Sequence, residues 1–263
     1  MKKYFLIFKF EVMSELQYVV NLLVKFIGMI IMLFILFNLW NYLYEDSSGI
    51  INGYTSFQMT WYVIITELLW SILGGRTLVN EVSNEVKSGS ITYKINKPYN
   101  YIIYLLSNHL GLVFIRAIMY VVIAMGLGIL FLGSFPKLSI INVLLIILTT
   151  IIAVIINTLL LIFIGLFSFF IEDSGPFYWL YSKLLLVMGT IFPIEFFPNY
   201  IQVFLKYSPV YVTSYGPAKL FVDFNYKTCS HILIAQIIYL TISYICCSLL
   251  YKKGVKNLNV NGG

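Results

Sequence analysis

Residues Asn84 to Tyr101 read NEVKSGSITYKINKPYNY and lie between two apolar segments that are each long enough to cross a membrane. This stretch holds three lysines, a Ser-Gly-Ser turn and a Lys-Pro break. Backbone groups inside a bilayer must be satisfied within a regular helix, so a stretch of this kind belongs outside the hydrocarbon. The polar stretch therefore separates two crossings of a membrane protein.

Composition supports this interpretation. Of the 263 residues, 60% are hydrophobic and only 11% are charged, and the mean hydropathy is +0.89. A soluble domain is less apolar, so the chain is predicted to form one integral membrane domain over residues 1–263. The net charge of +6 suits basic loops at a membrane, and no motif for binding nucleic acid is present.

Apolar segments of about 20 residues predict membrane-spanning helices. The sequence contains six, so the expected fold is all-α with six transmembrane helices. They cover about residues 19–44, 54–75, 101–133, 140–170, 177–197 and 231–251.

Basic residues predict the orientation of these helices. If both termini are cytoplasmic, ten lysines and arginines fall on the inner side and four on the outer side. Cytoplasmic flanks are enriched in such residues, so we expect the N and C termini and the segment 76–100 to be cytoplasmic.

Two further segments are not expected to span. Residues 1–18 place Phe5, Phe8 and Val12 at helical spacing, which predicts an interfacial elbow helix before the first span. In residues 190–225, four prolines divide the apolar run into pieces too short to cross. These pieces predict an outer re-entrant hairpin between the fifth and sixth helices.

No catalytic constellation emerges from the residue types. The two histidines, His109 and His231, lie far apart, and the three cysteines have neither disulfide nor metal-ligand spacing. A phosphate-binding P-loop is absent. We therefore expect no cofactor and no metal on this chain, and no enzymatic activity of its own.

Charges within predicted spans are costly and usually face the interior of a helix bundle. Glu67, Arg116 and Lys183 are such charges. Glu67 and Arg116 fall at similar depth toward the cytoplasmic side, which predicts an intramembrane pair with a structural role rather than a substrate contact.

The whole pattern resembles the permease subunits of type-2, exporter-like ABC transporters of bacteria. The elbow, the six spans and the polar inner segment match that plan, and GSITYKINKPYNY, Gly89 to Tyr101, is similar to a segment of such permeases. The prolines of the outer hairpin are placed like their outer-gate motif. This resemblance implies gate residues in that hairpin, namely Pro193, Phe197, Pro198, Val203, Pro209 and Tyr211.

The resemblance also implies that residues 76–100 form a coupling helix that docks on a separate ATPase. RTLVNEVSNEVK, Arg76 to Lys87, is compatible with a helix and has an apolar side that would suit such docking. The residues expected to couple to the ATPase are Val79, Val82, Glu85, Val86 and Lys87.

The expected function is therefore the permease subunit of an ATP-driven exporter in a bacterial plasma membrane. The resemblance implies two ATPase subunits, which would bind ATP and Mg²⁺, and a second permease, identical or related. An ion-coupled secondary transporter should show internal repeats and polar breaks at mid-membrane, and a membrane enzyme should show paired acids or a histidine cluster. Both remain alternatives at this stage.

Overall fold

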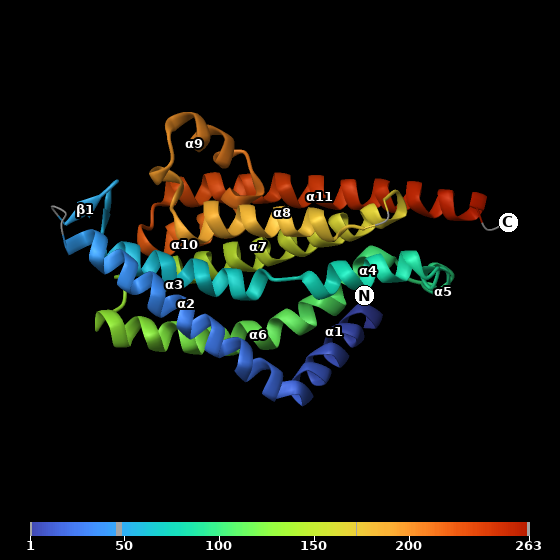
Figure 1. Ribbon diagram of the computed structural model, residues 1–263, viewed down its shortest axis with the longest axis horizontal. Helices are drawn as coiled ribbons and strands as arrows, with labels where there is room; N and C mark the ends of the chain where they lie inside the picture. The colour runs from blue at the N-terminus through green and yellow to red at the C-terminus, as the bar shows by residue number, and fades with distance from the viewer. Residues whose placement is uncertain (1, 46–48, 172, 262–263) are drawn as a thin grey trace.

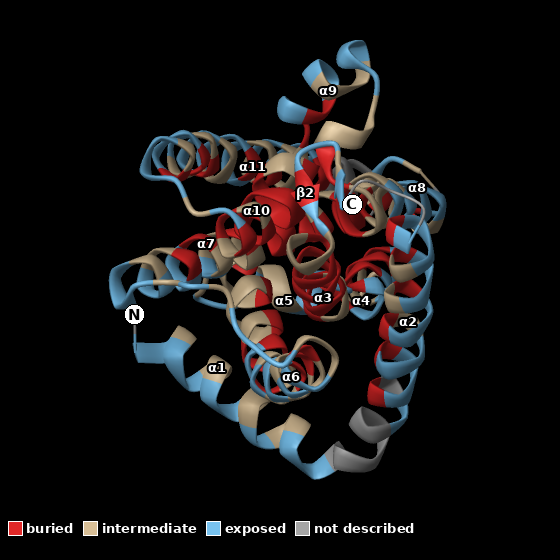
Figure 2. Ribbon diagram, turned by 90° about the vertical axis from the view of Figure 1, so that its left-hand side faces the viewer, coloured by how far each residue is buried: buried red, intermediate tan, exposed pale blue. Residues whose placement is uncertain are grey.

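The computed structural model describes residues 2–45, 49–171 and 173–261, with side chains except at 18–23, 25 and 257–261. The long helices form a bundle in which most lie roughly side by side along one direction, whereas the first two run obliquely to the others (Figures 1 and 2). They are α1 (Lys2–Glu15), α2 (Val19–Glu45), α3 (Ser56–Leu73), α4 (Arg76–Lys87), α6 (Tyr101–Leu132), α7 (Ile140–Leu166), α8 (Gly175–Leu185) and α11 (Tyr226–Asn261).

Short elements connect these helices. β1 and β2 form an antiparallel hairpin of two residues each. The short elements are η1 (Leu16–Tyr18), β1 (Ile50–Ile51), β2 (Tyr54–Thr55), α5 (Ile91–Ile95), η2 (Phe167–Phe169), η3 (Leu186–Ile191), η4 (Ile194–Phe196), α9 (Asn199–Lys206), η5 (Tyr211–Tyr215) and α10 (Gly216–Val222).

Five helices in the described part of the chain are long and apolar enough to cross a membrane. They correspond to the first, second, third, fourth and sixth predicted spans, so the all-α membrane class is confirmed. The fifth predicted span consists of α8, with 11 residues, followed by the π-helical turn η3, with 6 residues. Its crossing of the membrane stays a prediction, as do the elbow and the re-entrant hairpin.

Helix α3 is the centre of the bundle (Figure 2). In an apolar 18-residue stretch of its candidate span, 72% of the residues are buried, against 22% in such a stretch of α11 and 28% in that of α2. The peripheral helices expose apolar side chains that a bilayer would cover. A side chain on α3 is therefore placed in the protein interior, whereas most side chains on α11 are not.

The first helix lies along α6 rather than standing free. A Cβ atom at Gly111 of α6 would stand 2.6 Å from the carbonyl oxygen of Phe8 and 2.9 Å from Cβ of Glu11. Only glycine permits this approach of the two helices. The amide nitrogen of Asn100, directly before α6, also donates a hydrogen bond to the Tyr4 hydroxyl at 2.8 Å.

A two-glycine break separates α3 from α4. A Cβ atom at Gly75 would stand 2.2 Å from a methyl carbon of Leu161 in α7, so the chain passes directly against that helix. The Asn157 side chain of α7 donates a hydrogen bond to the Leu73 carbonyl at 2.8 Å, and the Tyr181 hydroxyl of α8 donates to Asn157 Oδ1 at 2.7 Å. These bonds satisfy a carbonyl that the end of α3 leaves without a helical partner.

The two ends of the bundle differ. Helices α4 and α5 and both chain termini lie toward one end, here called the α5 end, and the β1–β2 hairpin lies at the other, the β1 end (Figure 1). Residues 190–225 form short pieces as their prolines predict, and α9 projects from the bundle (Figures 1 and 2).

Candidate functional site

The largest cavity we describe, here called the charged cleft, has a volume of about 660 Å³. This volume lies in the range of small-molecule sites. Its walls come from α2, α3, α6, α8 and η3, together with the start of α4. Its charged and aromatic lining residues are Glu67, Trp70, Arg76, Arg116, Tyr120, Tyr178 and Lys183.

Helix α3 forms one wall because its residues recur at helical spacing. Glu67, Ser71 and Gly74 lie four and three residues apart and all line the charged cleft. Seven residues of helix correspond to roughly 10 Å, so Glu67 lies deeper in the bundle than the α3–α4 break. Arg76, directly after the break, lines the α5 end of the same cleft.

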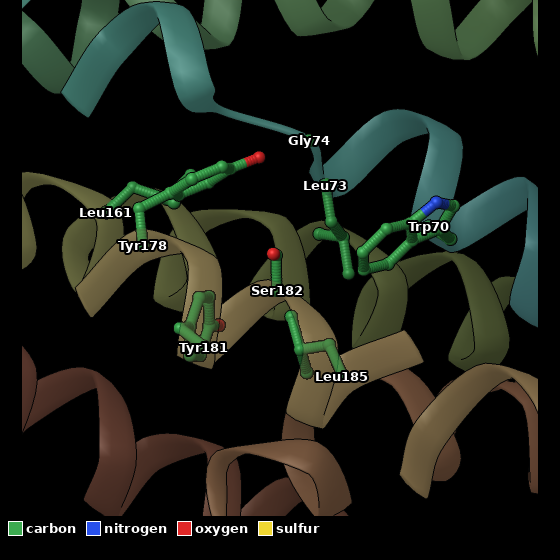
Figure 3. A pocket seen from close by; sticks show the side chains of 8 residues that line it. All are labelled: Trp70, Leu73, Gly74, Leu161, Tyr178, Tyr181, Ser182 and Leu185. Atoms are coloured by element: carbon green, nitrogen blue, oxygen red, sulfur yellow. The ribbon is translucent and has the colours of Figure 1, made fainter. Parts of the chain in front are cut away.

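A second cavity next to the break is too small for a substrate. It is enclosed by Trp70 and Leu73, which point from α3 toward α8, and by Tyr178, whose side chain reaches toward Gly74 (Figure 3). Its volume of about 10 Å³ is close to the least that one water needs. We therefore take the charged cleft as the candidate binding site.

The predicted pairing of Glu67 with Arg116 is wrong. The Nε atom of Arg116 lies 2.7 Å from Oε1 of Glu15, at the end of α1, and the two side chains are only 11% and 12% exposed. The Oε2 atom of Glu67 is buried without a hydrogen-bond partner. Glu15 is not predicted as the partner of Arg116, because no pattern in the sequence shows that α1 packs on α6.

A second acidic residue of α1 faces the same helix. The Asn108 side chain donates a hydrogen bond to Oε2 of Glu11 at 3.0 Å. Burial raises the pKa of Glu11 above its ordinary value, although the bond from Asn108 acts in the opposite direction. Polar contacts from Glu11 and Glu15 thus hold α1 along α6.

The predicted docking side of α4 is also corrected by the structure. Val79 and Val82 are 0% exposed and Val86 is 8% exposed, because this side packs against α7 and η2 of the same chain. A Cβ atom at Gly165 of α7 would stand 2.9 Å from Cβ of Val82. An amphipathic helix covers its apolar side with the nearest apolar surface, and here that surface is α7.

The two charged residues predicted to couple have partners within the chain. Glu85 forms an ion pair with Lys94 of α5 and accepts a hydrogen bond from the Tyr101 hydroxyl at 2.8 Å. Lys87 lies 3.6 Å from Asp173, in the loop before α8. Burial alone would lower the pKa of Lys94, but its hydrogen bond to Glu85 and the nearby negative charges raise it. Lys94 therefore stays cationic and holds α5 against α4.

The exposed surface at this end lies on α5 instead. Tyr93 is 78% exposed, and Thr92, Asn96 and Lys97 are exposed beside it. Gly89 has a φ of +72°, which only glycine adopts readily, and it turns the chain between α4 and α5. The sequence argument missed this short helix, although the Ser-Gly-Ser turn signalled a break in that place.

A polar network joins four elements, β2, η4, η5 and α10, at the β1 end. Glu195, next to the predicted gate, accepts hydrogen bonds from the hydroxyls of Tyr54 at 3.1 Å and Tyr215 at 2.6 Å. Lys219 lies 3.6 Å from Glu195 and 3.1 Å from Asp223. Burial, together with the nearby Tyr215 and Glu195, raises the pKa of Tyr54, which keeps its hydroxyl protonated as a donor. We call Tyr54, Glu195, Tyr215 and Lys219 the Glu195 network.

The six predicted gate residues surround this network unevenly. Pro193 is buried, Phe197 contacts Phe192 edge to face at 6.2 Å, and Tyr211 stacks on Tyr215 at 5.7 Å. Pro198 directly precedes α9 and Pro209 is partly buried, whereas Val203 of α9 is 57% exposed. The structure thus brings Pro193, Phe197 and Tyr211 near Glu195 and leaves Val203 facing outward.

Within the described residues, no group of three histidine, cysteine or acidic side chains is arranged to hold a metal ion. The buried His109 has no hydrogen-bond partner at Nε2.

Comparison with known proteins identifies the family. The family model for "ABC-2 family transporter protein" matches residues 15–262. No curated protein matches the chain.

Proposed function

Because the chain belongs to the ABC-2 transporter family, we propose that it is the permease subunit of an ATP-driven exporter. The family match makes it a membrane component of an ABC transporter and disfavours both a secondary transporter and a membrane enzyme. We also propose that transport is outward, and we propose the roles of α5, the charged cleft and the Glu195 network. The chain itself provides the substrate path, and a separate subunit hydrolyses ATP.

The main support for this proposal is that α5 is held firmly in place with an exposed surface. Helix α4 is fixed on α7 by buried valines, and Lys94 ties α5 to Glu85, so α5 is held in place while Tyr93 stays exposed. A partner that moves α5 would also move α4 and, through the two-glycine break, the wall of the charged cleft. Coupling of this kind requires that the partner bind one arrangement of α5 better than another.

We infer the partners from this arrangement. Two ATPase subunits would dock at the α5 ends of two permeases, identical or related, and would bind ATP and Mg²⁺ themselves. The α5 end and both termini would then face the cytoplasm of a bacterium, and the β1 end would face outward. The Glu195 network, with Pro193, Phe197 and Tyr211 around it, would close the path on that side.

Co-purification tests the proposal. The tagged full-length chain is extracted from its native membranes in mild detergent, and the associated proteins are analysed for an ATPase. We expect an ABC ATPase to be retained by the wild type and lost from a Tyr93→Asp variant. Tyr200→Asp is the matched control, because Tyr200 is similarly exposed, at 75% against 78% for Tyr93, but lies on α9 at the other end. Absence of any ATPase from the wild-type preparation, or equal retention by both variants, contradicts the proposal.

A further inference from the structure

The charged cleft carries more positive charge than its own residues neutralise. Among the described residues, neither Arg76 nor Lys183 has an ion-pair partner. Arg116 is paired with Glu15, and Asp173, which lines an adjoining pocket together with Arg76, lies 3.6 Å from Lys87. Against these two cations the cleft lining offers one acidic residue, Glu67, so at least one positive charge is left over among the described residues. An anionic ligand would supply the missing charge.

The buried Glu67 indicates that the ligand should have a hydrogen-bond donor as well as an anionic group. This residue is only 4% exposed, and its Oε2 atom has no hydrogen-bond partner. A buried carboxyl group without a partner is unfavourable. A hydroxyl or ammonium group on a ligand in the cleft would donate to Glu67 and relieve that cost.

Part of the remaining lining is apolar and adaptable. Its apolar side chains are Met29 and Met32 of α2, Trp70 of α3 and Leu186 of η3, and the hydroxyl groups of Ser71, Thr77, Tyr120 and Tyr178 lie among the other lining residues. Methionine side chains adjust to ligands of irregular shape. A Cβ atom at Gly28, also in this wall, would meet nothing within 4 Å. Because α2 is a peripheral helix (Figure 2), this wall lies on the side of the bundle next to the lipid.

We propose that the charged cleft binds an anionic lipid whose headgroup carries a hydrogen-bond donor. The anionic group lies between Arg76 and Lys183, the donor of the headgroup bonds to Glu67, and the acyl chains contact Met29, Met32 and Trp70. This inference rests on the proposed function, because it names the substrate class of that permease. A neutral apolar substrate would fit better in the two crevices of about 360 and 320 Å³ between α3, α6 and α7, which lack charged side chains.

Lipid binding to the purified full-length chain in neutral detergent tests the assignment. The probes are short-chain phosphatidylglycerol and phosphatidylmethanol, which have the same charge, although only phosphatidylglycerol has headgroup hydroxyls. We expect phosphatidylglycerol to bind about tenfold more tightly, and Glu67→Leu to abolish this difference. Arg76→Gln and Lys183→Gln should each weaken binding of both lipids about tenfold, whereas Lys206→Gln on α9 should not.

Other probes distinguish the source of the anion. Glycerol phosphate has the headgroup chemistry without acyl chains, and short-chain phosphatidylcholine has acyl chains without net charge. Both should bind at least tenfold more weakly than phosphatidylglycerol. Equal binding of glycerol phosphate would identify a soluble anion and overturn the lipid assignment, and equal binding of phosphatidylcholine would overturn the role of the two cations.

The wild-type comparison alone decides the role of Glu67, even if Glu67→Leu does not fold. Equal affinity for phosphatidylglycerol and phosphatidylmethanol in the wild type would remove that role. These outcomes are separate from those of the co-purification experiment, because loss of lipid binding in Arg76→Gln leaves α5 and its ATPase contact unchanged. A chain that retains the ATPase but shows no selectivity among these probes would overturn the lipid assignment and keep the proposed function.

Discussion

Gly165 of α7 and Val82 of α4 are in direct contact: a Cβ atom on the glycine would stand 2.9 Å from Cβ of the valine. The valine is 0% exposed, so the neighbouring atoms leave it no room to move away. Helix α4 therefore cannot move independently of α7 at this point. This contact makes the polar extension beyond α3 part of the bundle.

Gly165→Ala should separate α4 from α7. Overpacking at such a contact costs roughly 1–3 kcal/mol of the free energy of unfolding, and thermal denaturation in detergent measures the change. Gly126→Ala in α6 is the control, because a Cβ atom there would meet nothing within 4 Å and alanine favours a helix. The control should therefore be neutral or slightly stabilising. Equal stability of the two variants would contradict the close contact.

Val82→Asp should prevent correct folding rather than only docking of a partner. The substitution places a carboxyl group among Val79, Val86 and the side chains of α7, and burying it without a partner costs several kcal/mol. We expect little folded protein by size-exclusion chromatography in detergent. A folded Val82→Asp protein that has lost only its ATPase would instead restore the original interpretation of α4 as the docking helix.

The sequence predicts those structural features that depend on neighbouring residues in the chain, and it does not predict those that depend on distant residues. Runs of apolar residues predict spans, prolines and glycines predict breaks, and both signals are local. The sequence therefore predicts the five helices that are long and apolar enough to cross a membrane, and the division of residues 190–225 into short pieces. Partners of charged residues are not local. Arg116 pairs with Glu15, which lies 101 residues earlier in the chain, because α1 packs along α6 at Gly111. No pattern in the sequence indicates that contact.

The same distinction explains the error in α4. Its apolar side was predicted correctly, but the sequence cannot tell whether a partner or the chain itself covers that side. Gly165 and Gly75 permit α7 to approach α4. A glycine can occur for several other reasons, so its presence in the sequence does not by itself predict such a contact. The sequence does not predict the Glu195 network because its members come from four elements, β2, η4, η5 and α10, and Tyr54 lies 141 residues before Glu195.

Arg116 and Glu15 should be energetically coupled. Removing one partner of a buried ion pair costs about 3 kcal/mol because the other charge is left uncompensated. Arg116→Gln and Glu15→Gln should therefore each lower stability, and the double variant should lose much less than their sum. The corresponding cycle for Arg116→Gln and Glu67→Gln should be close to additive. Strong coupling in the second cycle and none in the first would contradict the pairing that we describe.

The ion pair between Lys94 and Glu85 should position α5 for its partner. Lys94→Met removes the charge but keeps the length of the side chain, and it leaves Glu85 with the Tyr101 hydroxyl alone. We expect a loss of about 1–2 kcal/mol of stability at this partly buried site, together with a weaker contact to the ATPase. Lys97→Met is the control, because Lys97 is exposed. Equal ATPase retention by the two variants would show that Lys94 does not position α5.

The Glu195 network should keep the β1 end closed. Glu195→Gln removes the ion pair with Lys219. It also leaves one acceptor oxygen where the carboxylate offers two, one to Tyr54 and one to Tyr215, and a bond to a neutral acceptor is weaker than one to a charged acceptor. A cysteine at Phe197, which is partly buried next to the network, should then react faster with a polar thiol reagent in the Glu195→Gln background. A cysteine at Val203 is the control, because that position is already 57% exposed and its labelling should not change.

Any increase in labelling at Phe197 should be largest in the complex without nucleotide, where the closed state is expected, and smaller when the ATPase is trapped with ATP. Unchanged labelling at Phe197 in every state would mean that Glu195 stabilises the β1 end without controlling access to it.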